Sequence, residues 1–255
     1  MDKNFDAKAL LARAQDVARL CEKQYSAKAL GFLTPADAQI VRGGFDKKSV
    51  GEDISFKFFG GYPDAERCLF LVYPGYAEET IDSEFIAVIE ITGRDLATLS
   101  HRDFLGSLLG LGLRREKIGD ILCLEDRCIV FVMSDIADYI MSNLSLVSRC
   151  GVTAKKVDLN AVKIPERQFE EIRTTVASLR LDSIIGAALR TSRSAAAEVI
   201  RAKRVSLNWQ ECTETSAKVL PGDVFSVRGA GRFSLSEEIN KTRKDRLGIC
   251  IQKAK

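Results

Sequence analysis

The amino-acid sequence predicts an α+β protein with an N-terminal helical region, a central βαββαβ region and a C-terminal helix–helix–β unit. Three observations lead to this fold class. Apolar residues recur at spacings of three and four near the N-terminus, strand-like and helix-like segments alternate in the middle, and two short helical segments precede two strand-like segments near the C-terminus. We place the regions at 1–66, 67–164, a linker helix at 165–179, and 180–255 with a basic C-terminal extension.

The composition is that of a globular protein, with 46% hydrophobic and 29% charged residues. No apolar run reaches about 18 residues, and the chain begins with a charged helical pattern instead of the apolar core of a signal peptide. We therefore expect a cytoplasmic protein without a membrane partner. The seven cysteines include no C-x-x-C pair and there is one histidine, so we expect scattered reduced thiols, no metal and no other cofactor.

Helical spacing predicts the first N-terminal helix, whose apolar face is formed by Ala7, Leu10, Leu11, Ala14, Val17, Ala18 and Cys21. A second helix is expected to begin after Thr34. This residue suits an N-cap, Pro35 suits the first helical position, and Asp37 can complete a capping box. Glycine pairs at 43–44 and 60–61 then interrupt the pattern.

From Phe85 onward the expected order of elements is β-α-β-β-α-β, preceded by a strand-like segment at 68–72. The strands are expected at 85–91, 121–124, 128–133 and 154–159, and the helices at 100–112 and 136–149. This is the split βαβ order of ferredoxin-like folds, which RNA-recognition motifs share. The segment 127–133 lacks the glycine and the paired aromatics that those motifs stack on bases, so Phe131 is expected to pack in the core.

The C-terminal third is basic. Residues 180–255 hold 15 Lys/Arg against 8 Asp/Glu, whereas residues 1–179 hold 23 against 27. After an expected helix at 168–177 come two helical segments, two strands at 204–208 and 224–228, and a Pro-Gly-Asp turn before the last strand. Such a charge asymmetry indicates that the C-terminal third binds a polyanion, although a solvated basic surface would have the same composition.

A set of short motifs in this third resembles the S4 RNA-binding domain. The motifs are Arg180-Leu181-Asp182, Thr191-Ser192-Arg193-Ser194, Ala196, Val199-Ile200, Val205-Ser206-Leu207-Asn208 and Leu220-Pro221-Gly222-Asp223. They occur in the order that this family has. One departure is Lys203, where the family commonly has glycine before the first strand.

The resemblance implies an RNA-binding surface in this unit. Ser192 would cap the second helix and turn its N–H groups toward an anion, and the Asn208 amide would read a base or a 2′-hydroxyl. Asp182 is as suited to holding Arg180 or capping a helix as to touching RNA. The expected RNA contacts are Arg180, Arg190, Thr191, Ser192, Arg193, Arg201, Lys203, Arg204, Asn208, Arg228 and Arg232.

Four further segments resemble the YlmH-type S4-domain proteins of bacteria and chloroplasts over nearly the whole chain. They are 60–67, 101–112, 117–121 and 226–233. The resemblance implies a monomer that binds rRNA, with tRNA as a further candidate, on the large ribosomal subunit in ribosome-associated quality control. No DNA specificity is expected. The alternative is an adaptor for protein partners in cell division, in which RNA binding is secondary.

One triplet, His101-Arg102-Asp103, matches the start of a kinase catalytic loop. Such a loop needs an asparagine five residues after the aspartate, and position 108 is leucine. A glycine-rich phosphate loop and a D-F-G motif are also missing from the sequence, so we expect no catalytic residues and no enzyme activity. Either the N-terminus of the helix expected at 100–112 would present His101 and Arg102 to phosphate, as secondary RNA contacts, or the motif would be purely structural.

Overall fold

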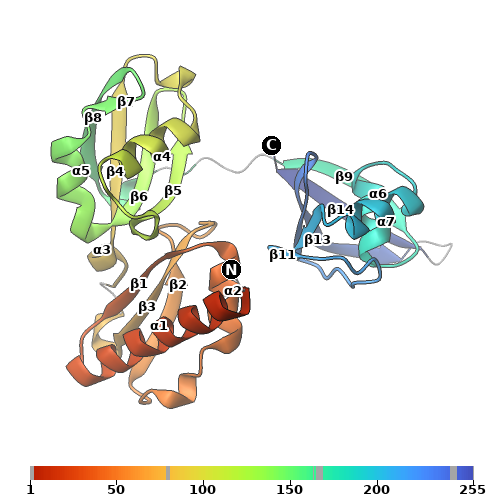
Figure 1. Cartoon of the computed structure of the whole chain (residues 1–255), viewed down its shortest axis with the longest axis horizontal. Coiled ribbons are helices and arrows are strands. Elements are labelled where there is room, and N and C mark those ends of the chain that lie inside the picture. Colours follow the sequence, from red (N-terminus) through yellow and green to blue (C-terminus); the bar gives the residue numbers. More distant parts are fainter. Residues whose placement is uncertain (1–2, 79–80, 163, 165–168, 242–245, 255) are drawn as a thin grey trace. The chain divides into compact units, whose positions relative to one another are not determined.

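The computed structural model describes residues 3–78, 81–162, 164, 169–241 and 246–254. The chain divides into two compact units, Met1–Ile164 and Pro165–Lys255, and each is described here by itself (Figure 1). In the described part of the chain, no helix has both the length and the apolar character needed to cross a membrane.

The N-terminal part of the first unit is a three-stranded antiparallel sheet with two helices packed on it (Figure 1). Its strands follow the order β1-β3-β2. Its elements are α1 (Lys3–Gln24), β1 (Lys28–Leu33), α2 (Pro35–Gly44), β2 (Ile54–Phe59), β3 (Cys68–Pro74) and the 3-10 helices η1 (Lys47–Ser49) and η2 (Gly75–Ala77). The expected face of α1 is confirmed, because Ala14, Ala18 and Cys21 are fully buried against this sheet.

The start of α2 follows the sequence-based expectation. The Thr34 hydroxyl accepts a hydrogen bond from the Asp37 N–H at 3.2 Å, and the Asp37 carboxylate accepts one from the Thr34 N–H at 3.3 Å. These two bonds satisfy two N–H groups that have no partner inside the helix. The capping box is therefore confirmed.

The sheet itself was not expected, and it changes the boundary between the first two regions. Strand β3 had been assigned to the central region, but it lies in the middle of the N-terminal sheet, so the boundary expected at 66–67 moves beyond Pro74. All seven residues of β3 are buried. Phe70 and Val72 pack on the side of α1 and α2, whereas Leu69 and Leu71 pack toward the central module.

The central module has the expected ferredoxin-like topology. Its five-stranded sheet has the order β5-β6-β4-β8-β7, with every neighbouring pair antiparallel. Its elements are α3 (Ile81–Phe85), β4 (Ile86–Gly93), η3 (Leu96–Thr98), α4 (His101–Gly110), η4 (Arg115–Lys117), β5 (Ile118–Cys123), β6 (Arg127–Met133), η5 (Ser134–Ile136), α5 (Ala137–Asn143), β7 (Leu146–Val147), β8 (Cys150–Val157) and η6 (Leu159–Ala161). The helix expected to reach residue 149 ends at Asn143 and is followed by the short strand β7.

Both faces of the central sheet are covered. Helices α4 and α5 supply Phe104, Leu108 and Ile140 to a core on one face. On the other face, Phe131 packs with Tyr62 and with the β3 side chains that point away from α1. The expectation that Phe131 is a core residue is confirmed, since it is fully buried.

The segment 60–67 joins the two modules through a buried carboxylate. Asp120 of β5 accepts hydrogen bonds from the Tyr62 hydroxyl at 2.8 Å, the Glu66 N–H at 2.7 Å and the Arg67 N–H at 3.0 Å. Gly61 has φ +103°, and a Cβ there would lie 2.3 Å from the Phe131 ring. Glycine is therefore required at position 61, where the backbone lies directly against the Phe131 ring.

In the second unit, two helices pack on one face of a six-stranded antiparallel sheet with the order β11-β10-β12-β13-β14-β9. Its core includes Leu181, Ile184, Ile200, Phe225 and Ile251, all fully buried. The elements are β9 (Phe169–Val176), α6 (Leu181–Ala188), α7 (Arg193–Arg201), β10 (Val205–Leu207), β11 (Gln210–Glu211), β12 (Val224–Val227), β13 (Gly231–Lys241) and β14 (Leu247–Ala254).

The prediction of a linker helix within 165–179 is wrong. Residues 169–176 form β9, an edge strand paired with β14 along its whole length, and the first residue of the expected helix, Gln168, lies outside the described residues. Ile172, Thr174 and Val176 alternate with exposed residues along β9, and Ile172 and Val176 pack into the core of the unit. Period-two packing and four β-branched residues in eight favour a strand once β14 is available as a partner.

The predicted basic C-terminal extension folds as part of the sheet of the second unit. Strand β14 lies between β13 and β9 and contributes the buried Ile249 and Ile251 to the core. Of the basic residues near the end of the chain, Lys241 is the last residue of β13 and Arg246 directly precedes β14, whereas Arg243 and Lys244 lie outside the described residues.

Candidate RNA-binding surface

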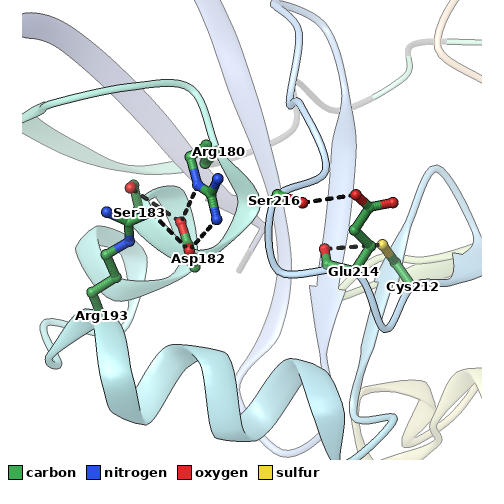
Figure 2. A network of polar contacts seen from close by, with 7 residues as sticks. All are labelled: Arg180, Asp182, Ser183, Arg193, Cys212, Glu214 and Ser216. Atoms are coloured by element: carbon green, nitrogen blue, oxygen red, sulfur yellow. Dashed lines mark hydrogen bonds and ion pairs between the residues drawn. The ribbon is translucent and has the colours of Figure 1, made fainter.

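An ion-pair cluster joins the start of α6 to the start of α7 (Figure 2). Arg180 is the N-cap residue of α6, Asp182 lies in its first turn, and Arg193 is the first residue of α7. Both arginines place Nη2 3.0 Å from Oδ2 of Asp182. The Asp182 side chain is 6% exposed, against 39% for Arg180 and 57% for Arg193. A buried carboxylate therefore holds two guanidinium groups at the surface.

The ion pairs set the charge state of Asp182. Burial alone would raise the pKa of its carboxyl group, but hydrogen bonds from Arg180 and Arg193, together with their positive charges, lower the pKa below the ordinary value of 3.8. The hydrogen bond to Asp182 in turn raises the pKa of Arg180. The carboxylate of Asp182 and the guanidinium of Arg180 are therefore both charged at neutral pH.

A loop that follows β11 supports this cluster from the other side (Figure 2). Backbone carbonyls of Ala217 and Thr215 accept hydrogen bonds from the N–H groups of Leu181 and Asp182, at 2.8 and 3.1 Å. Within the loop, the Ser216 hydroxyl donates to the Glu214 carboxylate at 2.7 Å. The first turn of α6 is thus held in place by a segment more than thirty residues further along the chain.

The turn between α6 and α7 is tight and is closed by predicted residues. Ser192 caps α7 as expected, with its hydroxyl accepting a hydrogen bond from the Ala195 N–H at 3.1 Å. The Thr191 N–H donates to the Gly186 carbonyl at 2.9 Å. A Cβ at position 186 would lie 3.3 Å from the Thr191 carbonyl oxygen, so glycine allows the two segments to approach each other closely.

Four basic residues form a second cluster where β10, β12 and β13 meet. Lys203, Arg204, Arg228 and Arg232 are all exposed and line one surface pocket of about 380 Å³. The Arg204 guanidinium donates to the Arg228 carbonyl at 2.9 Å, and the Arg228 N–H donates to the Arg204 carbonyl at 2.8 Å. The Lys203 ammonium lies 3.9 Å from the carboxylate of Glu211. We call these four residues the hairpin cluster.

Lys203 has φ +57°, in the left-handed region that glycine adopts without strain. The turn before β10 therefore has the geometry that the family's usual glycine would give. We expect Lys203→Gly to unfold at higher urea concentration than Lys203→Ala, with a difference in unfolding free energy of about 1 kcal/mol, because only alanine carries a Cβ into this conformation.

The two variants lose the same positive charge, so they form a matched pair. Chemical denaturation measures their difference in stability, and titration with RNA measures their affinity. Equal stability of the glycine and alanine variants would contradict the left-handed turn. Equal losses of affinity are expected if the ammonium group alone contacts RNA.

Asn208 uses both ends of its side-chain amide inside the protein. Its Nδ2 donates to the Asp223 carboxylate at 2.8 Å, and its Oδ1 accepts from the Val224 N–H at 3.0 Å. The other Asp223 oxygen accepts from the Leu220 N–H at 2.7 Å. These bonds tie the end of β10 to the Pro-Gly-Asp turn, so Asn208 has a structural role besides its predicted contact with RNA.

The other two predicted arginines flank α7. Arg190 lies in the preceding turn with φ +52°, and Arg201 is the last residue of the helix. Both are exposed. By helical rise, Arg193 and Arg201 lie about 12 Å apart along the helix axis. The structure therefore gathers Arg180 and Arg193 in the ion-pair cluster and Lys203, Arg204, Arg228 and Arg232 in the hairpin cluster, with Arg190 and Arg201 beside the two ends of α7.

One neighbouring pocket was missed by sequence reasoning. It measures about 290 Å³ and is lined by Thr174 and Thr175 of β9, by Asp182 and Arg193, and by Arg246. The Arg246 guanidinium donates to the Thr175 hydroxyl at 3.1 Å and to its carbonyl at 2.7 Å. The alternation of Ile172, Thr174 and Val176 was the available sequence signal for this strand, and a helix was assigned there instead.

His101 and Arg102 are the first two residues of α4, in the other unit, and both are exposed. Asp103 closes a capping box, accepting from the Ser100 hydroxyl at 2.6 Å and from its N–H at 2.9 Å. The hydrogen bonds from Ser100 lower the pKa of this carboxyl group. The aspartate of the kinase-like triplet is therefore a helix cap, and Arg102 borders a pocket of about 440 Å³ with Asn143 and Ser148.

Comparisons with known proteins match both units. Residues 82–161 match the family model described as "Putative RNA-binding domain in YlmH", and residues 179–225 match the S4 domain. The "Ribosome-associated protein quality control protein P2" of Bacillus subtilis (strain 168) is 32% identical over 251 residues, covering 98% of this chain and 96% of that protein.

A solved structure, "Cell division protein ylmH from Streptococcus pneumoniae", has a similar fold. It is 19% identical with a TM-score of 0.50, and the match covers 63% of this chain and 96% of that chain. Identity at this level supports the fold alone, whereas the B. subtilis match extends over almost the whole sequence. The chain therefore belongs to the family of YlmH-type, S4-domain RNA-binding proteins.

Proposed function

We propose that the chain binds structured RNA of the large ribosomal subunit, as a factor in ribosome-associated quality control of stalled peptidyl-tRNA complexes. Ribosomal RNA is the proposed main ligand, tRNA a further one, and no reaction is catalysed. The observation that carries this proposal is the pair of guanidinium groups held on the buried Asp182, at the opposite end of α7 from the hairpin cluster. The role of the B. subtilis relative, as its name gives it, supports the ribosomal setting.

The arrangement suits phosphate recognition by shape. Guanidinium groups form charge-assisted hydrogen bonds with phosphate oxygens, and arginines fixed in advance lose less side-chain entropy on binding than mobile ones do. The first and last residues of α7, Arg193 and Arg201, lie about 12 Å apart along the helix axis, so basic side chains at its two ends can engage separate phosphates of a folded RNA. Proteins recognise double-stranded RNA largely through its shape, its phosphates and its 2′-hydroxyl groups.

The central module would contact RNA in a different way from an RNA-recognition motif. Those motifs stack bases on an open sheet face, but here Val88, Ile129 and Phe131 of that sheet are buried against the N-terminal module. Any RNA contact of this module therefore has to use its helical side or its edges. The exposed start of α4, with His101 and Arg102, is the surface we propose for it.

The decisive experiment is sedimentation with ribosomes in sucrose gradients at moderate salt. We expect the wild-type chain to move with large subunits, and Arg201→Glu combined with Arg228→Glu to remain near the top. Each reversal removes one phosphate contact and adds a repulsion, so affinity should fall by roughly two orders of magnitude. Both side chains are exposed, so folding should be little affected.

The matched control is Lys8→Glu combined with Arg19→Glu, which makes the same change in net charge on the exposed side of α1. This variant should sediment with the subunits as the wild type does. A wild-type chain that stays in the upper fractions would contradict the ribosomal role and favour the adaptor for protein partners. Equal losses in both double variants would mean that net charge alone drives the association.

A further inference from the structure

Two cysteines face each other on the β5–β6 hairpin of the first unit. Cys123 ends β5, Cys128 lies near the start of β6, and they are directly opposite in the strand register. The turn between them is closed by the Leu124 N–H, which donates to the Arg127 carbonyl at 2.8 Å. Hydrogen-bonded and non-hydrogen-bonded pairs alternate along an antiparallel ladder, so the neighbouring pair, Cys123 and Cys128, is a non-hydrogen-bonded one.

That position suits a disulfide. The Cα atoms of a non-hydrogen-bonded pair lie about 4.5 Å apart, and disulfides bridge Cα atoms from about 4.4 to 6.8 Å. Residues directly opposite in a ladder also point to the same face of the sheet. The bond can therefore form without a movement of either strand.

The two thiols differ in exposure and in acidity. Cys123 is exposed and Cys128 is buried. A hydrogen bond from Cys128 lowers the pKa of the Cys123 thiol, and the same bond, together with burial, raises the pKa of Cys128. Thiolates are the nucleophilic form of cysteine. Cys123 is thus the thiol expected to react first with an oxidant, and the sulfur of Cys128 lies opposite it in the strand pair.

We propose that Cys123 and Cys128 form a reversible disulfide, which makes this hairpin a modification site for peroxides. The Cys123 thiolate attacks one oxygen of hydrogen peroxide, the O–O bond breaks, and hydroxide leaves as a sulfenic acid forms. The Cys128 thiol then attacks that sulfur, the S–O bond breaks, and water leaves with the thiol proton. A dithiol reductant returns both residues to thiols.

The remaining cysteines lack this combination. Cys21, Cys68 and Cys250 are buried, and burial raises the pKa of the first two. Cys150 is half-buried and faces Val147 in the strand register. Cys212 is half-buried in the second unit, in the loop that follows β11. We therefore expect peroxide to oxidise the hairpin pair selectively.

The test is peptide mapping of the full chain after brief treatment with hydrogen peroxide and alkylation of the remaining thiols. Trypsin cuts after Lys117, Arg127 and Arg149, so Cys123 and Cys128 fall in separate peptides, 118–127 and 128–149. We expect these two peptides to appear as one linked species without reductant and to separate after reduction. In denaturant, titratable thiols should fall from seven to about five, since one disulfide consumes two.

Cys123→Ser is the control, since the exposed site tolerates the change and Cys128 then lacks its partner. In this variant we expect Cys128 to stay reduced under the same treatment. The proposal is overturned if wild-type Cys123 becomes sulfinic acid without a linked peptide, or if it is found linked to another cysteine. It is also overturned if all seven thiols remain titratable. None of these outcomes depends on whether the chain binds ribosomes.

Discussion

Replacing Asp182 by asparagine is expected to weaken RNA binding by about tenfold, even though the change removes a negative charge from a basic surface. The carboxylate holds Arg180 and Arg193 in one arrangement, and releasing two long side chains costs about 0.5–1.5 kcal/mol each when they must be ordered again on RNA. If net charge alone governed affinity, the same variant would bind more tightly. The sign of the change therefore separates positioning from simple electrostatics.

Glu198→Gln is the matched control for this test. It makes the same change in charge on the exposed surface of α7, where Glu198 has no contact with the ion-pair cluster in the described structure. We expect its affinity to equal or slightly exceed that of the wild type. Titration of a ribosomal RNA fragment at one salt concentration measures the affinity of the wild type, Asp182→Asn and Glu198→Gln for RNA. If Asp182→Asn binds RNA more tightly than the wild type, Asp182 does not act by positioning the two arginines.

The stability of the same variant should depend on pH in a defined direction. At neutral pH, Asp182→Asn is expected to lower the free energy of unfolding by about 1.5–3 kcal/mol, the usual range for hydrogen bonds to a charged group. Because the folded pKa of Asp182 lies below 3.8, its contribution is complete above that pH and is lost as the pH falls through the folded pKa. Urea unfolding from pH 7 to pH 3 should show the two proteins converging only at the acid end.

Raising the salt concentration from 50 to 200 mM is expected to lower RNA affinity by roughly 250- to 4,000-fold. This follows from a log–log slope of about −4 to −6, if five to seven of the predicted basic residues bind phosphates at once. Arg228→Ala should make the slope shallower by about one unit and should weaken binding similarly for different RNA sequences. The measurement is a titration of one rRNA fragment at several salt concentrations.

Two controls sharpen the salt experiment. Asp182→Asn leaves every arginine in place, so it should keep the wild-type slope while losing affinity. Asn208→Ala should lower stability, because it breaks the bonds to Asp223 and Val224, and should leave the slope unchanged. A nearly flat dependence for the wild-type protein would show that the basic surface of the second unit is not the RNA-binding face.

The parts of the fold that were predicted correctly rest on short-range chemistry. The capping boxes at Thr34 and Ser100, and the N-cap at Ser192, depend on residues three positions apart. The ferredoxin-like order follows from apolar runs and turns along one stretch of chain. The S4 motifs likewise located the basic residues that the structure gathers at the two ends of α7.

Strand β9 shows what the sequence left undecided. Its eight residues pair with β14, more than seventy positions further along the chain, and without that partner their charged and β-branched pattern fits a helix nearly as well as a strand. Strand β3 was likewise found but assigned to the wrong sheet, because a fully apolar run does not say which two layers will cover it.

The chemistry of the sites divides in the same way. The sequence by itself indicated that Asp182 and Arg193 lie near helix starts, and the expected strands at 121–124 and 128–133 place Cys123 and Cys128 on either side of a short connection. Only the tertiary structure showed one carboxylate shared by two arginines, because α7 folds back onto the first turn of α6. Only the tertiary structure made one thiol exposed and its neighbour buried. Burial and charge depend on neighbours brought together by folding, and these neighbours set the pKa and the freedom of each group.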